Sequence, residues 1–164
     1  MRIENKMYCS LRRLDKLPVS WREMVQTRLM GRFVPFLSTA GLRFEQLSRE
    51  SVRVSIRNRR AVQNHIKGVH ACAMALLAET ATGFAVQMNV PDDKLILLKS
   101  MNIQYVKRSV GNMHAVARIS DEMAARLQTE ERGNFVVPCE VGDESGEPPV
   151  LVEMVWAWVP KKRD

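Results

Sequence analysis

Three polar side chains stand at the start of, or inside, the most apolar stretch of the chain, "QNHIKGVHACAMALLAETATGFA", residues 63–85. Asn64 and His70 belong to its polar beginning, whereas Glu79 lies within the apolar run. Between residues 69 and 86 the only ionisable side chains are His70, Cys72 and Glu79. Because a buried carboxylate costs free energy unless it is paired, Glu79 predicts either an ion pair or a chemical role.

The apolar run predicts a helix of about 17 residues that begins near His70 or Ala71. Gly68 permits a tight or positive-φ turn just before it. The first N–H groups of a helix lack partners and carry partial positive charge, so this helix start could hold an oxyanion. Glu79 lies about 13 Å farther along the helix. It must therefore act on a site formed with another element or with a second subunit.

Simpler structural interpretations of the same residues remain open at this point. Glu79 could pair with an arginine of a sheet, Asn64 could be a turn residue, and His70 could cap the helix or lie in the core. The residue types and their spacing do not separate these alternatives from a catalytic site.

The composition favours a single cytoplasmic domain without metal or disulfide support. The chain has 164 residues, of which 46% are hydrophobic, enough for a sizeable core. The three cysteines, Cys9, Cys72 and Cys139, lack metal-ligand or disulfide spacing and favour a reducing compartment. The charged first residues and the absence of a long apolar window predict neither a signal peptide nor a membrane span. The three histidines show no pairing with carboxylates typical of a zinc hydrolase, so we expect no metal.

The net charge of +7 favours an anionic partner, such as nucleic acid, a membrane surface or a phosphorylated small molecule. Basic residues concentrate in the segment 53–67 and again at Lys107 and Arg108. No aromatic residue interleaves with the first segment, and no nucleic-acid motif is present. We therefore expect no nucleic-acid partner, and a binder of that kind is the weakest of the alternatives.

The remaining elements that the sequence predicts surround the apolar helix. Residues 21–33 carry Trp21, Met24, Val25, Leu29 and Phe33 at helical spacing, which indicates a short amphipathic N-terminal helix. Residues 120–133 predict a second short helix, capped by Ser120 or Asp121. Alternation and apolar runs predict strands at residues 42–47, 51–58, 95–108, 112–120, 134–141 and 150–159. A helix that is apolar on almost all sides must be covered, so we expect an α+β fold in which an antiparallel sheet wraps around it.

This arrangement resembles the hotdog fold, in the acyl-CoA thioesterase branch often called PaaI-like. The motif of that family is Asn or Gln, then His-Gly-Gly six residues later at the start of the central helix, then Asp or Glu nine residues after the His. Asn64, His70 and Glu79 match this spacing, Gly68 fits the loop, and "SMNIQYVKR" resembles the strand that follows. The order of elements agrees over residues 42–160. The N-terminal and basic segments resemble an uncharacterised bacterial subgroup, a domain of unknown function.

The resemblance implies one hotdog domain over residues 1–164, with a helical extension at 1–40 and a core at 41–160. It implies a thioester hydrolase in which Glu79 is the general base or the nucleophile. The Ala71 N–H would polarise the thioester carbonyl beside His70, and Asn64 would position the water or that carbonyl. In this family the site lies between subunits, so we expect a homodimer or a tetramer. We also expect burial to raise the pKa of Glu79.

Coenzyme A would be part of the substrate, and no separate cofactor is expected. Basic side chains are candidates to bind its phosphates, and Gly68 belongs to the adjoining loop. The acyl chain would enter a slot between helix and sheet lined by residues such as Met74, Leu77 and Phe84. The candidate phosphate-binding residues are Arg57, Arg59, Arg60, Lys107 and Arg108.

The chain departs from the family motif in one respect, because it has His-Ala-Cys where the family has His-Gly-Gly. Ala71 keeps its N–H, but its Cβ adds bulk where the family lets the substrate approach. Cys72 is interpreted as a small helix residue rather than a nucleophile. The departure leaves an alternative open, in which the protein binds acyl-CoA or acyl-carrier protein without hydrolysing it.

Overall fold

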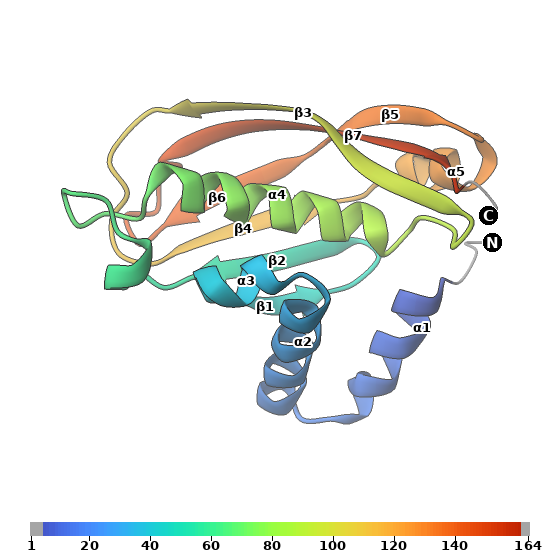
Figure 1. The fold of residues 1–164 in the computed structure, drawn as a ribbon, viewed down its shortest axis with the longest axis horizontal. Coiled ribbons are helices and arrows are strands. Elements are labelled where there is room, and N and C mark those ends of the chain that lie inside the picture. Colours follow the sequence, from blue (N-terminus) through green and yellow to red (C-terminus); the bar gives the residue numbers. More distant parts are fainter. Residues whose placement is uncertain (1–4, 162–164) are drawn as a thin grey trace.

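A long central helix, α4 (Ala71–Gln87), runs between two antiparallel sheets in the computed structural model, which describes residues 5–161 (Figure 1). Residues 1–4 of the predicted extension and residues 162–164 lie outside the described part of the chain. The other helices are α1 (Lys6–Arg12), η1 (Arg13–Lys16), α2 (Val19–Phe33), α3 (Pro35–Ala40), η2 (Arg60–Val62) and α5 (Asp121–Thr129). The strands are β1 (Leu42–Leu47), β2 (Ser51–Ile56), β3 (Lys94–Tyr105), β4 (Met113–Arg118), β5 (Gly133–Val137), β6 (Cys139–Asp143) and β7 (Val150–Pro160).

The predicted position of the central helix is confirmed. Helix α4 has 17 residues and begins directly after His70, which is its N-cap. Its second half is buried almost without a break, from Thr80 to Val86, because strands of both sheets pack against it. Gly83 allows a close approach to β7, since a Cβ at this position would lie 2.7 Å from the ring of Trp156.

The two sheets have the strand orders β1-β2-β4-β6 and β3-β7-β5, and every pairing is antiparallel. The prediction of a single strand over residues 134–141 is wrong, because Pro138 divides it into β5 and β6. Proline has no N–H to donate to a ladder. Strand β5 consequently pairs with β7, whereas β6 pairs with β4. At Pro138 the chain thus passes directly from a strand of one sheet to a strand of the other.

The N-terminal extension is a set of helices, of which α2 lies beyond β1 (Figure 1). The helix predicted at residues 21–33 is confirmed, and it begins two residues earlier, at Val19. Its buried residues are Gln26, Met30 and Gly31. Most of its apolar stripe faces outward, with large exposed side chains at Trp21, Met24, Leu29 and Phe33.

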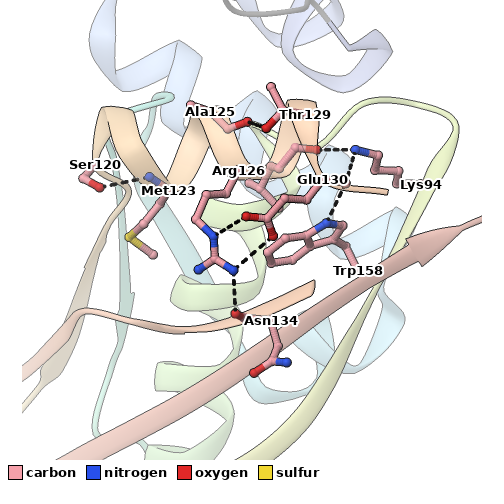
Figure 2. A network of polar contacts seen from close by, with 10 residues as sticks. Lys94, Ser120, Met123, Ala125, Arg126, Thr129, Glu130, Asn134 and Trp158 are labelled. Carbon is pink, nitrogen blue, oxygen red and sulfur yellow. Dashed lines mark hydrogen bonds and ion pairs between the residues drawn. The ribbon is translucent and has the colours of Figure 1, made fainter. Parts of the chain in front are cut away.

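The short helix α5 is held against the sheet by a polar network at its C-terminal end (Figure 2). The buried ammonium of Lys94 on β3 donates to the carbonyl oxygens of Leu127 (2.6 Å) and Glu130 (2.7 Å). The indole N–H of Trp158 on β7 donates to the same Glu130 carbonyl (3.1 Å). The last carbonyls of a helix have no partner within it, and a cation stabilises this end of the helix dipole. Lys94 thus fixes α5 to β3.

Candidate functional site

The loop before α4 is folded around the side chain of Asn64. Its Oδ1 accepts hydrogen bonds from the N–H groups of Ile66 (3.1 Å) and Gly68 (3.0 Å). The chain makes a tight turn here, and its positive φ is at Lys67 (63°) rather than at Gly68. Gly68 instead permits close packing, because a Cβ there would lie 3.1 Å from the Ser109 hydroxyl. Asn64 therefore shapes the loop through its oxygen and keeps its amide N–H groups as donors.

The start of α4 presents one free backbone donor. The Cys72 N–H donates to His70 Nδ1 (3.1 Å), and the Ala73 and Met74 N–H groups donate to the His70 carbonyl (2.9 and 3.0 Å). The Ala71 N–H, the remaining donor of this first turn, has no partner within residues 5–161. Since unpaired N–H groups at a helix start carry partial positive charge, the Ala71 N–H can stabilise a developing negative charge.

A cavity of about 590 Å³ opens at this helix start. Its lining includes Asn64, Gly68, Ala71 and Met74, together with three cationic side chains. Tyr105 also lines it, and its hydroxyl donates to the Ala71 carbonyl (3.1 Å). Sequence reasoning missed Tyr105 and Lys67 as lining residues. The cationic lining residues are Lys67, Lys107 and Arg108.

The predicted phosphate-binding cations fall into two groups. Lys107 and Arg108 line the cavity at the helix start, where the Lys107 ammonium is held by Glu147 (2.9 Å). Arg57, Arg59 and Arg60 are not among its lining residues. The Arg59 guanidinium donates instead to the Thr39 carbonyl (3.1 Å) and so joins the loop after β2 to the end of α3. The structure therefore gathers two of the five predicted cations at this cavity.

Glu79 faces a second, smaller cavity of about 150 Å³. The sheet contributes Trp156 and Ile96 to its walls, and α4 contributes Phe84. Phe33, Val34 and Leu37 close it from the N-terminal extension. Sequence reasoning missed these three residues, because no periodicity indicates that a helix so far before α4 folds back beside it. The cavity is apolar apart from Glu79, Thr80 and Gln87.

The Glu79 carboxylate is half-buried and forms no ion pair with any residue in the described part of the chain. Burial raises its pKa, and the Thr80 hydroxyl, which donates to Oε2 at 3.5 Å, partly offsets this shift. The alternative interpretation, in which Glu79 pairs with an arginine of a sheet, is therefore wrong. A carboxylate that is poised to accept a proton and lacks a counter-ion is suited to base catalysis.

Within one chain, Glu79 and the Ala71 N–H line different cavities. The residues predicted to line the acyl slot are divided in the same way. Phe84 lies at the Glu79 cavity, Met74 lies at the helix-start cavity, and Leu77 is fully buried and lines neither. The two halves of the predicted site are thus separate in a single subunit, as the length of helix between them requires.

Other kinds of site find little support among residues 5–161. No cluster of three or more His, Cys, Asp or Glu side chains there could hold a metal ion. None of the helices in the same range is both long enough and apolar enough to cross a bilayer. No disulfide joins Cys9, Cys72 and Cys139, and burial raises the pKa of the Cys139 thiol to about 12.

Comparison with known proteins places the chain in a family and identifies its fold. The sequence profile of the family described as "Domain of unknown function (DUF4442)" matches residues 22–159. No curated protein matches the chain. A Pseudomonas aeruginosa protein of unknown function, called a probable thioesterase, has a similar structure, with a TM-score of 0.77 at 22% identity over 84% of this chain and 95% of its own.

Two further solved structures are similar to this one. A variant of a second Pseudomonas aeruginosa thioesterase has a TM-score of 0.69 at 18% identity, over 89% of this chain and 97% of its own. A thioesterase from Haemophilus influenzae has a TM-score of 0.62 at 12% identity, over 76% of this chain and 82% of its own. These proteins share the hotdog fold, so the predicted fold class is confirmed.

Proposed function

The chain belongs to the DUF4442 family and has the hotdog fold, and from this premise we propose that it hydrolyses an acyl thioester such as an acyl-CoA. The observation that carries the proposal is the Glu79 carboxylate, which faces an apolar cavity without a counter-ion. An apolar cavity suits an acyl chain, and a base at its wall suits attack on the carbonyl at the end of that chain.

In the proposed reaction, Glu79 acts at the thioester carbonyl carbon in one of two ways. As a general base it takes a proton from water, whose oxygen attacks that carbon. As a nucleophile its oxygen attacks directly and forms an anhydride that water then hydrolyses. In both cases the carbonyl oxygen becomes an oxyanion, the carbon–sulfur bond breaks, and the thiolate leaves and takes up a proton.

The oxyanion would be held by the Ala71 N–H, the free donor at the start of α4. Asn64 would contribute through its amide N–H groups, because its Oδ1 is occupied within the loop. The phosphates of coenzyme A would bind at the same cavity, beside Arg108 and Lys67. Lys107 would join them if its pair with Glu147, which is exposed, exchanged for a phosphate.

A homodimer would bring the two halves of this site together. Strand β3 is an edge strand of its sheet and pairs only with β7 among the described residues. It has 12 residues, with exposed apolar side chains at Leu95, Leu97 and Met101. Such an edge presents unpaired N–H and C=O groups that favour pairing with another strand. We therefore propose that two subunits join along β3 and that Glu79 of one serves the helix start of the other.

Hydrolysis of a panel of short, long and aromatic acyl-CoAs by the wild type and by Glu79→Gln tests this function. The substitution keeps the shape of the side chain and removes the base, so we expect kcat/KM to fall at least about a hundredfold. Glu131→Gln, at an exposed position, is the matched control and should retain wild-type rates. A Glu79→Gln variant as active as the wild type would show that the assignment is wrong.

A second candidate function is the binding of acyl-CoA or acyl-carrier protein without hydrolysis. It is favoured by Ala71, whose side chain stands at the cavity where the family motif has glycine. Calorimetric titration with coenzyme A distinguishes the two candidates when it is combined with the hydrolysis panel. Retained binding with no turnover of any acyl-CoA would support the second candidate.

A further inference from the structure

Helix α2 turns its apolar stripe away from the protein. Trp21 is 60% exposed, Leu29 46% and Phe33 68%, and Met24 is also exposed. The helix rests on the rest of the structure through Gln26, Met30 and Gly31 instead. Since large apolar side chains gathered on one exposed face mark an interaction site, this stripe requires a partner that covers it.

The charges around the stripe indicate what that partner is. Residues 5–41 contain seven Lys or Arg side chains and two carboxylates, so this segment carries +5 of the chain's net +7. Arg28 and Arg32 lie on the exposed side of α2 with the stripe. Neither forms an ion pair with another described residue. The partner must therefore be apolar inside and anionic at its surface.

We propose that α2 docks this protein onto the surface of an anionic lipid bilayer. A helix with Trp, Phe and Leu on one side and basic residues beside them binds in the interface of such a bilayer without spanning it. Tryptophan favours this depth, and arginine side chains reach the lipid phosphates. Helix α2 lies outside the two sheets, beyond β1 (Figure 1), so a flat surface can approach it.

A second copy of the chain fits the same surface less well. In a two-fold interface the same patch meets itself, so Arg28 and Arg32 of each copy would face like charges at a cost in free energy. Nucleic acid would satisfy the arginines but would leave the apolar stripe exposed to water. A bilayer with anionic headgroups satisfies both features of the helix.

The stripe also adjoins the proposed active site. Its last residue, Phe33, lines the cavity that Glu79 faces. A bilayer beneath α2 would therefore lie next to the wall of that cavity. Docking itself requires no hydrolysis, so it can be tested independently of the proposed function.

Flotation of the purified protein with lipid vesicles tests the proposal. We expect binding to vesicles of equal parts phosphatidylcholine and phosphatidylglycerol, none to phosphatidylcholine alone, and weaker binding in high salt. The double substitution Trp21→Ser with Leu29→Ser should weaken binding at least about tenfold. Arg28→Glu with Arg32→Glu should weaken it by about 25-fold or more, since each basic residue near an anionic surface contributes about fivefold.

Two control variants separate docking by α2 from general stickiness or charge. Leu151→Ser removes a leucine of similar exposure (51%) from β7. Arg118→Glu with Arg132→Glu makes the same change in net charge at exposed positions elsewhere. Both should bind like the wild type. All the substituted side chains are exposed, and circular dichroism would verify that each variant is folded.

Four results would overturn the proposal. The first is no binding to the anionic vesicles, and the second is equal loss of binding in the two charge-reversal variants. The third is a fall in oligomeric mass, measured by light scattering, in the Trp21→Ser, Leu29→Ser variant, because the stripe would then be an interface between copies. Tighter binding of duplex DNA than of vesicles, with the same dependence on Arg28 and Arg32, would identify nucleic acid as the partner instead.

Discussion

At the scale of single residues, the most informative feature is that Glu79 is half-buried without a counter-ion. Among the described residues, the Glu79 carboxylate accepts a hydrogen bond only from the hydroxyl of the neighbouring Thr80. Burial disfavours the charged form of a carboxyl group, and its pKa is raised accordingly. The folded protein thus binds the Glu79 proton more tightly than the unfolded chain does. This difference affects both stability and rate.

We predict a matched pair of pH dependences for Glu79. Because its pKa is raised on folding, its contribution to the free energy of unfolding falls as pH rises from the ordinary glutamate pKa through the raised one. Glu79→Gln should therefore be more stable than the wild type at neutral pH, and this advantage should disappear in acid, as measured by urea unfolding. Over the same pH range, kcat/KM of the wild type should rise as the base ionises. A Glu79→Gln variant that is less stable at neutral pH would contradict this account.

At the scale of elements, local signals in the sequence predict some features and cannot predict others. Helix α4 was predictable because Gly68, His70 and an uninterrupted apolar run together define its start and its burial. The division at Pro138 was not predicted, because the residue is compatible with an edge strand and only the pairing partners show that the chain changes sheets. The outward orientation of α2 was also hidden, since periodicity identifies an apolar stripe but not the direction in which it faces.

In the candidate site, too, local sequence signals predict some residues and not others. The sequence placed Asn64 in the loop before α4, His70 at the start of this helix and Glu79 within it, and the structure has them there. The wall formed by Phe33 and Leu37 depends on a long-range contact between the extension and α4. No local pattern encodes that contact.

The attachment of α5 gives a prediction at this scale. Lys94→Met keeps an unbranched side chain but removes the ammonium that caps the carbonyls of Leu127 and Glu130. We expect the free energy of unfolding to fall by about 2 kcal/mol, since buried acceptors lose a charged donor. Lys99→Met, at an exposed position of the same strand, should change it little. Equal effects of the two substitutions in urea unfolding would show that the network in Figure 2 contributes no specific stability.

At the scale of the whole molecule, the proposed reaction requires two subunits. Glu79 and the Ala71 N–H line separate cavities of one chain, and about 13 Å of helix lies between them. An exposed edge strand is present to join a partner. A homodimer built in this way contains two equivalent sites, each with a helix start from one subunit and a glutamate from the other.

Mixing two inactive variants tests this shared site directly. Ala71→Pro removes the N–H donor at the first position of α4, where proline is well tolerated in helices. The preceding His70 is already extended, at φ −65° and ψ 143°, as a residue before proline should be. Ala71→Pro and Glu79→Gln should each be inactive alone. In a heterodimer of the two, one site combines the intact Ala71 of one subunit with the intact Glu79 of the other.

After unfolding and refolding the two variants together in equal amounts, half of the dimers are mixed and each has one intact site. We therefore expect acyl-CoA hydrolysis to recover to about a quarter of the wild-type rate. If each site lay within a single subunit, every site in the mixture would carry one of the two defects and no activity would return. Mixing the folded variants without unfolding them is the control, because subunits that do not exchange cannot complement each other.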